Sequence, residues 1–480
     1  MEKQRENWGS RIGFILAAAG SAVGLGNIWR FPYLTGENGG SAFILIYLVF
    51  VFLIGLSVMI AEFSVGRSSG LAAVGAIKHY SDRWTFVGIM GVLAAFLIMG
   101  FYPVVGGWAL AYIVESFTGL LSMTAEEIDG TFGAFITGTW EPVIWMLVFL
   151  GMNILIVAKG IKGGIEKAAK VLMPTLFILL IFIAFRSLTL EGAGEGIAFL
   201  FQPDFSEVTG ATFLAALGQA FFSLSLGMGC MITYGSYLSK KETLASNAAI
   251  VTVLDVSVAL LAGLAMFPAL FAFGMEPAQG PGLVFVVIPI VFSQMGGLGT
   301  LFGIIFFISL AVAALTSSVS LMEVVVAYLI DQKDMPRKKA VYGTGFVMAI
   351  TGVLASLSMG VFGPLPVLQV GFFDLFDILS DKVFLGLGGM FIAIFTGWIV
   401  DKEILRKELT NDGTSEFKLF EAWHFMIKWV IPPAVALVAV AGMFKFDEPE
   451  YFGLFGSNFP VLIFGILIVV VLALFSRKLD

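Results

Sequence analysis

Two stretches of the chain place residues that can bind ions inside long apolar segments. Residues 20–33 read GSAVGLGNIWRFPY, and residues 221–229 read FFSLSLGMG. Glycine weakens a helix, and Asn27 and Arg30 are costly in hydrocarbon. A helix broken at mid-membrane depth exposes carbonyls that suit a small cation and, at the start of the next half-helix, amides that suit a carboxylate. The two breaks therefore predict a site that holds a zwitterion together with sodium.

A simpler interpretation exists for the first stretch, because Gly20 and Gly24 have the spacing of a helix-packing motif. That interpretation does not explain Asn27, Arg30 or the matching break in the second stretch. In the first stretch we expect freed carbonyls at Gly20, Ala22 and Val23, and freed amides at Leu25 and Gly26.

Other apolar segments also carry polar side chains. Segment 243–273 contains Asp255, and a carboxylate buried in a bilayer is costly enough to be a functional candidate by default. Another segment contains Thr316 and Ser317, whose hydroxyls could simply bond to their own helix. For Glu62, which lies nearer the end of its segment, a structural ion pair or a helix-end contact is an equally good explanation.

The composition indicates an integral membrane protein. Hydrophobic residues make up 59% of the 480 residues and charged residues 13%, against about 45–50% and about 25% in soluble proteins. The apolar runs are long and continuous, which is typical of α-helical spans rather than barrel strands. The net charge of −7 and the lack of a polybasic tail argue against nucleic acid as a partner. No metalloprotease, phosphate-loop or nucleophile-elbow motif is present, so we do not expect an enzyme.

Counting apolar runs gives twelve spans that would position these residues. They cover approximately 12–36, 41–66, 87–118, 142–158, 168–187, 212–238, 243–273, 300–330, 340–360, 375–400, 422–444 and 458–476. Lysine and arginine gather on the loops of one side, which predicts a multi-pass protein with both termini in the cytoplasm.

The two interrupted spans, the first and the sixth, lie five spans apart. Paired Gly-interrupted segments point to the binding site of a transporter built from two repeats, and an odd number of spans requires the copies to be inverted. We therefore expect a single domain, 1–480, in which 12–187 and 212–400 are inverted repeats and 422–476 forms two additional spans.

The chain resembles the neurotransmitter:sodium symporter family, in particular its prokaryotic sodium-dependent amino-acid transporters. Four stretches carry the resemblance: WGSRIGFILAAAGSAVGLGNIWRFPYL, ENGGSAF, GQAFFSLSLGMGCMITYGSYL and ALTSSVS. The resemblance implies the LeuT-like fold, an all-α membrane protein of twelve transmembrane helices in a 5+5 inverted repeat with discontinuous helices 1 and 6. It also implies two sodium ions carried with an amino acid.

The family resemblance assigns oxygen ligands to each sodium ion. The site that includes the substrate carboxylate would use Ala22, Asn27, Ser223 and Asp255. The second sodium site would use Gly20, Val23, Ala313, Thr316 and Ser317.

The resemblance likewise implies the substrate contacts and the gates. The carboxylate would meet the amides of Leu25 and Gly26 and the hydroxyl of Tyr102, and the ammonium would face carbonyls at Ala22, Phe222, Ser223 and Ser225. The full substrate-binding set is Ala22, Gly24, Leu25, Gly26, Ile98, Tyr102, Phe222, Ser223, Ser225, Met228, Ser317 and Leu321. An outer gate would pair Arg30 with Asp377, and the cytoplasmic side would be closed by Arg5 and Asp331 with Trp8, Ser236 and Tyr237.

Chloride-dependent relatives bind their anion beside the sodium site that the substrate completes. Tyr47, Gln219 and Ser223 match that pattern, but Ala259 replaces a serine and Asp255 occupies the neighbouring amide position. A fixed carboxylate can balance the charge of sodium, so we expect transport without chloride.

No acidic or basic residue is expected in the side-chain pocket, which favours a neutral hydrophobic substrate with an aromatic or large aliphatic side chain. The expected location is the plasma (inner) membrane of a prokaryote. Proton coupling through Asp255 and an amino-acid-binding channel or receptor on the same fold remain alternatives to sodium-coupled import. The partners are then the amino acid and the lipid bilayer, with a homodimer as one candidate for the oligomeric state.

Overall fold

The computed structural model describes residues 6–206, 208–275, 282–443 and 459–476. Helices make up most of this part of the chain, and none of it forms a β-strand. In the first half the α-helices are α1 (Arg11–Ala22), α2 (Phe31–Glu37), α3 (Ser41–Phe50), α4 (Leu56–Ser69), α5 (Ala73–Tyr80), α6 (Thr85–Thr118), α7 (Ala125–Thr137), α8 (Glu141–Val157), α9 (Glu166–Leu188) and α10 (Ala193–Phe201). In the second half they are α11 (Gly210–Ser223), α12 (Cys230–Gly235), α13 (Leu244–Ala272), α14 (Ile288–Gln294), α15 (Gly297–Lys333), α16 (Arg337–Leu357), α17 (Phe372–Ile378), α18 (Gly386–Ile394), α19 (Lys402–Thr410), α20 (Phe420–Phe425), α21 (Ile431–Met443) and α22 (Phe459–Ser476).

Short wide-turn π-helical segments lie next to several of these helices. They are η1 (Gly26–Arg30), η2 (Val51–Gly55), η5 (Ile161–Ile165), η6 (Leu283–Val287), η7 (Leu379–Leu385), η8 (Phe395–Ile399) and η9 (Met426–Val430). Single 3-10 turns occur at η3 (Asp82–Trp84) and η4 (Leu120–Ser122).

Each of the twelve predicted spans coincides with a helix or with a run of joined helices. By length and composition, seven helices in the described residues could cross a membrane, or nine if each of two bent pairs counts as one span. A shorter apolar helix, Gly210–Ser223, covers the first half of the sixth span, and another, Pro460–Ser476, covers the last. The stretch TAEEIDG, which lies between two predicted spans, is the start of α7, because Thr124 and Glu127 form a capping box that begins a helix there.

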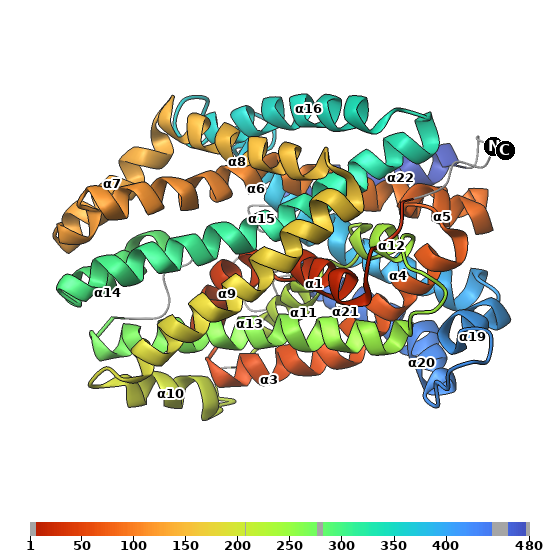
Figure 1. Cartoon of the computed structure of the whole chain (residues 1–480), viewed down its shortest axis with the longest axis horizontal. Helices are drawn as coiled ribbons and strands as arrows, with labels where there is room; N and C mark the ends of the chain where they lie inside the picture. The colour runs from red at the N-terminus through yellow and green to blue at the C-terminus, as the bar shows by residue number, and fades with distance from the viewer. Residues whose placement is uncertain (1–5, 207, 276–281, 444–458, 477–480) are drawn as a thin grey trace.

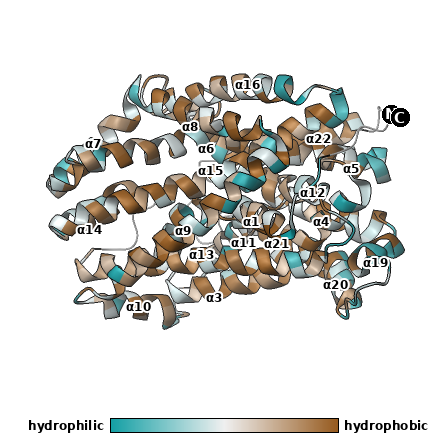
Figure 2. Cartoon of the chain, viewed as in Figure 1, coloured by the Kyte–Doolittle hydropathy of each residue, from teal (hydrophilic) through white to brown (hydrophobic). Residues whose placement is uncertain are grey.

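The helices run along the longest axis of the molecule (Figure 1). The long helices α6 and α15 pack on one another, and α1 lies in the middle of the bundle against α9, α13 and α15. Helices α5, α19 and α20 lie at one end, and α7, α10 and α14 lie at the other. Hydrophobic residues cover the middle of the helices, and hydrophilic ones gather around α19 and α20 (Figure 2).

Both predicted breaks are present near the middle of the bundle. Helix α1 ends at Ala22, the chain resumes at Gly26, and the two halves are bent by 47°. Between α11 and α12, residues Ser225, Gly227 and Gly229 have φ values of 53°, 76° and 75°. Left-handed backbone cannot continue an α-helix, so the second break follows directly from these three residues.

Candidate functional site

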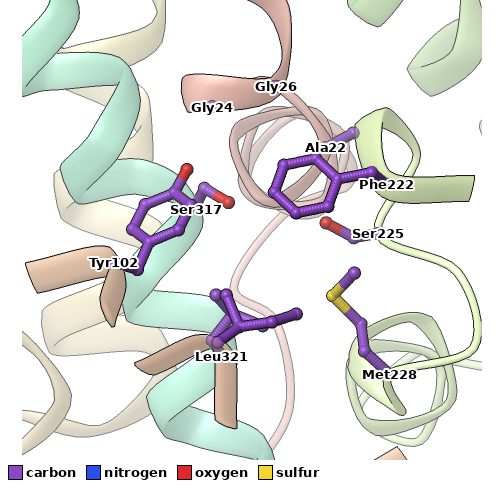
Figure 3. Close-up of a pocket in the computed structure, with 10 residues that line it drawn as sticks. Ala22, Gly24, Gly26, Tyr102, Phe222, Ser225, Met228, Ser317 and Leu321 are labelled. Atoms are coloured by element: carbon purple, nitrogen blue, oxygen red, sulfur yellow. The ribbon is translucent and has the colours of Figure 1, made fainter. Parts of the chain in front are cut away.

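A small cavity lies between the two breaks. It is lined by Ala22, Gly24, Gly26, Ile98, Tyr102, Phe222, Ser225, Met228, Ser317 and Leu321. Phe222, Ser225 and Met228 face Tyr102, Ser317 and Leu321 across this space (Figure 3). All ten belong to the predicted substrate-binding set, and none is acidic or basic.

The two remaining members of the predicted set lie immediately behind the lining. The Leu25 N–H donates to the hydroxyl of Tyr102 at 2.9 Å, which joins the start of the second half-helix to α6. A Cβ at Gly24 would lie 2.4 Å from the same hydroxyl, so only glycine permits this approach. Ser223 instead turns its hydroxyl toward Asp255, donating to Oδ2 at 2.8 Å.

Polar contacts also tie the two broken spans to one another. The Ser225 hydroxyl donates to the Ser21 carbonyl at 2.8 Å, and Gln219 Nε2 donates to the Gly26 carbonyl at 2.7 Å. The Ser21 carbonyl beside the first break is therefore satisfied by a side chain from the second break, and Gln219 adds a further link between the two spans, which couples their positions.

Three of the four residues predicted for the first sodium site form one buried cluster. Asn27 Nδ2 donates to Asp255 Oδ1 at 2.8 Å and to the Ser223 hydroxyl at 3.1 Å, and Asn27 Oδ1 accepts the Gly24 N–H at 3.1 Å. The fourth, Ala22, lines the adjacent cavity. Among the described residues, no lysine, arginine or histidine lies within ion-pair distance of Asp255, which is fully buried.

The residues predicted for the second sodium site also come together. The Thr316 hydroxyl lies 3.0 Å from the Ala313 carbonyl and 3.4 Å from the Val23 carbonyl. Gly20 faces the same side chain, since a Cβ there would lie 3.1 Å from Thr316 Cβ. Ser317 is on the next position of α15 and lines the cavity. Such a group of neutral hard oxygens has the chemistry that a small monovalent cation requires.

Glu62 takes a role that the sequence left open. Its Oε1 accepts the Gly227 N–H at 2.8 Å, so α4 supplies a buried acceptor to an amide freed by the break before α12. The sequence analysis named Glu62 but did not identify this partner.

The outer ion pair requires a correction. Arg30 was expected to pair with Asp377, but its two terminal nitrogens bind Asp381 Oδ1 and Oδ2, each at 2.7 Å. Asp377 and Asp381 are one turn apart on the same helix, and the spacing alone does not distinguish them. Phe222 lies beside this pair, with its ring centre 4.9 Å from the Arg30 guanidinium.

Of the residues predicted to close the cytoplasmic side, Arg5 lies outside the described residues. Trp8 Nε1 donates to the Tyr234 carbonyl at 3.1 Å, and the rings of Trp8 and Tyr237 pack edge to face. Asp331 accepts the N–H of Ala72 at 2.8 Å. The Ser236 hydroxyl donates to the Thr233 carbonyl at 2.5 Å.

Two buried carboxylates that the sequence analysis did not select complete this side. Tyr237 donates to Glu323 Oε1 at 2.8 Å, and Arg337 binds Glu323 Oε2 at 2.5 Å. Glu166 accepts the Gly9 N–H at 2.6 Å and the Ser10 hydroxyl at 2.9 Å. Both carboxylates lie in or beside predicted apolar spans, so the rule applied to Asp255 would have found them.

Two broken helices around an enclosed, uncharged cavity, inside an all-helical membrane fold, define a membrane transporter with discontinuous helices. The model of the sodium:neurotransmitter symporter family matches residues 5–128 and 126–477. The uncharacterized sodium-dependent transporter YhdH of Bacillus subtilis is 40% identical over 440 residues, which cover 91% of this chain and 97% of YhdH. A taurine transporter of Bos taurus, named as sodium- and chloride-dependent, is 28% identical over a match that covers 82% of this chain and 70% of that transporter.

The structure of MhsT in complex with L-phenylalanine superposes with a TM-score of 0.84. It is 47% identical in sequence, and the match covers 91% of this chain and 99% of MhsT. The chain belongs to the sodium:neurotransmitter symporter family. It is accordingly a multi-pass, sodium-dependent membrane transporter with the LeuT-like fold, and not an enzyme.

Proposed function

We propose that the protein is a symporter that imports a neutral hydrophobic L-amino acid, aromatic or large aliphatic, together with sodium by alternating access. The observation that carries the proposal is the cavity between the two breaks, whose ten lining residues include no acidic or basic side chain. A substrate side chain with a charge would lose its hydration there without gaining a partner. The likeness to MhsT, whose structure holds L-phenylalanine, supports the same substrate class.

The ends of the zwitterion have complementary surroundings in this proposal. The substrate carboxylate meets the amides of Leu25 and Gly26, where the positive end of a half-helix begins, and takes a hydrogen bond from Tyr102. The ammonium faces carbonyls of Ala22, Phe222, Ser223 and Ser225. Sodium bound among Asn27, Ser223 and Asp255 then neutralises the carboxylate from its other side.

Uptake of labelled L-phenylalanine into proteoliposomes tests the proposal. An inward sodium gradient should drive accumulation, unlabelled leucine should compete, and lysine and glutamate should not. Uptake driven by a pH gradient without sodium would establish the proton-coupled alternative. Binding without counterflow exchange would establish a receptor.

A matched pair of tyrosine variants tests the assigned site. Tyr102→Phe removes a hydroxyl that faces the cavity and contacts Leu25 at 2.9 Å, so KM for L-phenylalanine should rise about tenfold, the equivalent of one lost charge-assisted hydrogen bond. Tyr112→Phe is the control, because the buried Tyr112 hydroxyl on the same helix has no hydrogen-bond partner among the described residues. Equal effects of the two variants would contradict the assignment.

Transport without chloride is the second part of the proposal, and it rests on Asp255. A buried carboxylate without a basic partner is costly unless a cation binds it. Asp255 therefore supplies the negative charge that chloride supplies in relatives named as chloride-dependent. Replacing chloride with gluconate should leave wild-type uptake unchanged, whereas Asp255→Asn should be inactive without chloride. Chloride-stimulated uptake by the wild type, or a chloride-free active Asp255→Asn variant, would refute this part.

The remaining expectations complete the proposal. Two sodium ions are carried, the second among the oxygens around Thr316. The protein lies in the inner membrane of a prokaryote with both termini in the cytoplasm. Residues 12–187 and 212–400 act as the two inverted repeats, with 422–476 added beside them.

A further inference from the structure

Two tryptophans and one lysine form a cluster on the outer surface of the bundle, away from the transport site. Lys428 Nζ lies 4.4 Å from the centre of the Trp398 ring and 5.8 Å from that of Trp429. The two rings pack edge to face with centres 4.5 Å apart. Trp398 Nε1 donates to the Lys428 carbonyl at 3.2 Å, and this hydrogen bond joins η8 to η9.

The backbones of these two segments approach closely at this point. A Cβ at Gly397 would lie 2.8 Å from Lys428 Cα, so the approach depends on glycine at position 397. The cluster is therefore positioned by backbone packing and by a hydrogen bond, rather than by chance contact of flexible side chains.

The cluster sits at the boundary between the apolar and polar parts of the surface. Trp398 precedes by three residues Asp401, the N-cap of the charged helix α19. The tryptophans are about half exposed, at 49% and 53%, and Phe425 beside them is 57% exposed. Exposed apolar side chains of this size belong against hydrocarbon, and tryptophan is enriched where hydrocarbon meets the headgroups.

The charge of Lys428 is not neutralised by the neighbouring ion pairs. Lys402 and Arg406 share Glu421, at 2.7 Å and 2.5 Å. Within the described parts of the chain, no carboxylate lies within 4.0 Å of Lys428. An ammonium over aromatic rings keeps its three N–H groups, and within the described residues none of those of Lys428 pairs with a carboxylate, so they can donate to an anion.

We propose that Lys428, Trp398 and Trp429 bind the phosphate of an anionic phospholipid in the leaflet that α19 and α20 face. Lys428 donates to the phosphate while its aliphatic stem and the two rings lie against the acyl chains. A lipid fits better than a soluble anion, because the exposed apolar rim needs hydrocarbon. The proposal does not depend on the identity of the transported substrate.

Lipid titrations of the purified full chain test the proposal, with phosphatidylglycerol as the probe and phosphatidylcholine as the reference. Native mass spectrometry counts the bound lipids. The wild type should bind phosphatidylglycerol about fivefold more tightly than phosphatidylcholine, the effect of one lysine at a membrane surface. Lys428→Gln should abolish this preference, and Lys428→Arg should retain it.

Lys339→Gln provides the matched control, because Lys339 is exposed in the first turn of α16 and lies on the same predicted side. It should leave the preference unchanged. Should Lys428→Gln fail to fold, Trp429→Leu keeps the charge, removes an exposed ring and should weaken binding of both lipids. A folded Lys428→Gln protein with the wild-type preference, an equal loss in Lys339→Gln, or unchanged lipid binding in Trp429→Leu would overturn the proposal.

Discussion

The two ends of the transport site are closed by different numbers of side-chain contacts. On one side a single bidentate ion pair, Arg30–Asp381, stands above the cavity with Phe222 beneath it. Both charged side chains are 15% exposed. Beyond this pair, no second salt bridge between described residues lies near Arg30.

The opposite side is closed by several separate clusters. One joins Trp8, Tyr237, Glu323 and Arg337, and a second joins Glu166 to the start of α1. A third cluster joins the end of α4 to α19.

In the third cluster, Arg67 Nε binds Glu408 Oε2 at 2.8 Å, and Lys240 pairs with the same carboxylate. Arg67 also donates to Asn411 Oδ1 at 2.9 Å, so the end of α4 is fastened to α19. The difference teaches that opening outward requires one ion pair to break, whereas opening inward requires several clusters to release together. A single substitution should therefore reduce uptake strongly at the Arg30–Asp381 pair and only weakly in one of the clusters on the opposite side.

The largest effect should come from the outer pair. Asp381→Asn leaves Arg30 without its partner in a largely buried place, where losing one member of an ion pair costs roughly 3–5 kcal/mol. Sodium-driven uptake should fall at least about tenfold. Asp377→Asn is the matched control and should reduce uptake less than about threefold. Equal losses would show that Asp377 shares the pairing.

A smaller effect on uptake is expected in the cluster of Trp8, Tyr237, Glu323 and Arg337. Glu323→Gln keeps the hydrogen bond from Tyr237 but removes the charge facing Arg337, which can still approach Glu6 at 3.7 Å. Uptake should fall about threefold, with a matching loss of sodium affinity as the inward-facing state becomes more populated. A tenfold loss would mean that the inner side, like the outer, depends on one contact.

The smallest effect should come from the start of α1. Glu166→Gln removes the charge from the acceptor of the 2.9 Å contact with Ser10, and Ser10→Ala removes the contact itself. Each should lower the free energy of unfolding by about 1–2 kcal/mol, with a coupling of about 1 kcal/mol in the double variant. Thermal unfolding of the four proteins measures this coupling, and strictly additive losses would exclude a functional contact between the two.

Lys170→Ala serves as the control for this cycle. Lys170 binds Glu166 at 2.6 Å across one helical turn but is 42% exposed. The Lys170 ammonium therefore keeps much of its hydration although Glu166 is buried, and its removal should cost about 1 kcal/mol or less. A larger loss would indicate that Lys170 holds the Glu166 carboxylate in place for Ser10.

Much of the fold could be predicted because the bilayer imposes its own pattern. Hydrocarbon requires continuous apolar helices, so hydropathy alone located the twelve segments that the helices cover. The breaks were also predictable, since Gly24 and Gly227 to Gly229 disfavour helix locally. Helix α7, which lies between two predicted spans, was not predicted, although the capping box of Thr124 and Glu127 is a local signal for its start.

The site could be predicted as a set of residues, but its pairings could not. Residue types and their positions in the two motifs, together with the family resemblance, placed all ten cavity-lining residues in the expected group. The partner of Arg30 was missed because Asp377 and Asp381 are one turn apart, and only the tertiary structure decides which carboxylate Arg30 reaches. Glu166 and Glu323 could have been selected as carboxylates in or beside apolar spans, but contacts such as those from Gly9 and Tyr237 could not be predicted, because they come from distant parts of the chain.

The sequence by itself determined where the helices break and which chemical groups the breaks release, because both follow from local residue type and from the bilayer. Only the tertiary structure decided which charges meet, since contacts such as Arg30–Asp381 join residues 351 positions apart. Electrostatic and hydrogen-bonding interactions between side chains are short in range, so their partners are set by a few ångströms of helix packing that no local pattern encodes. The unequal closure of the two sides is for that reason a property of the folded molecule.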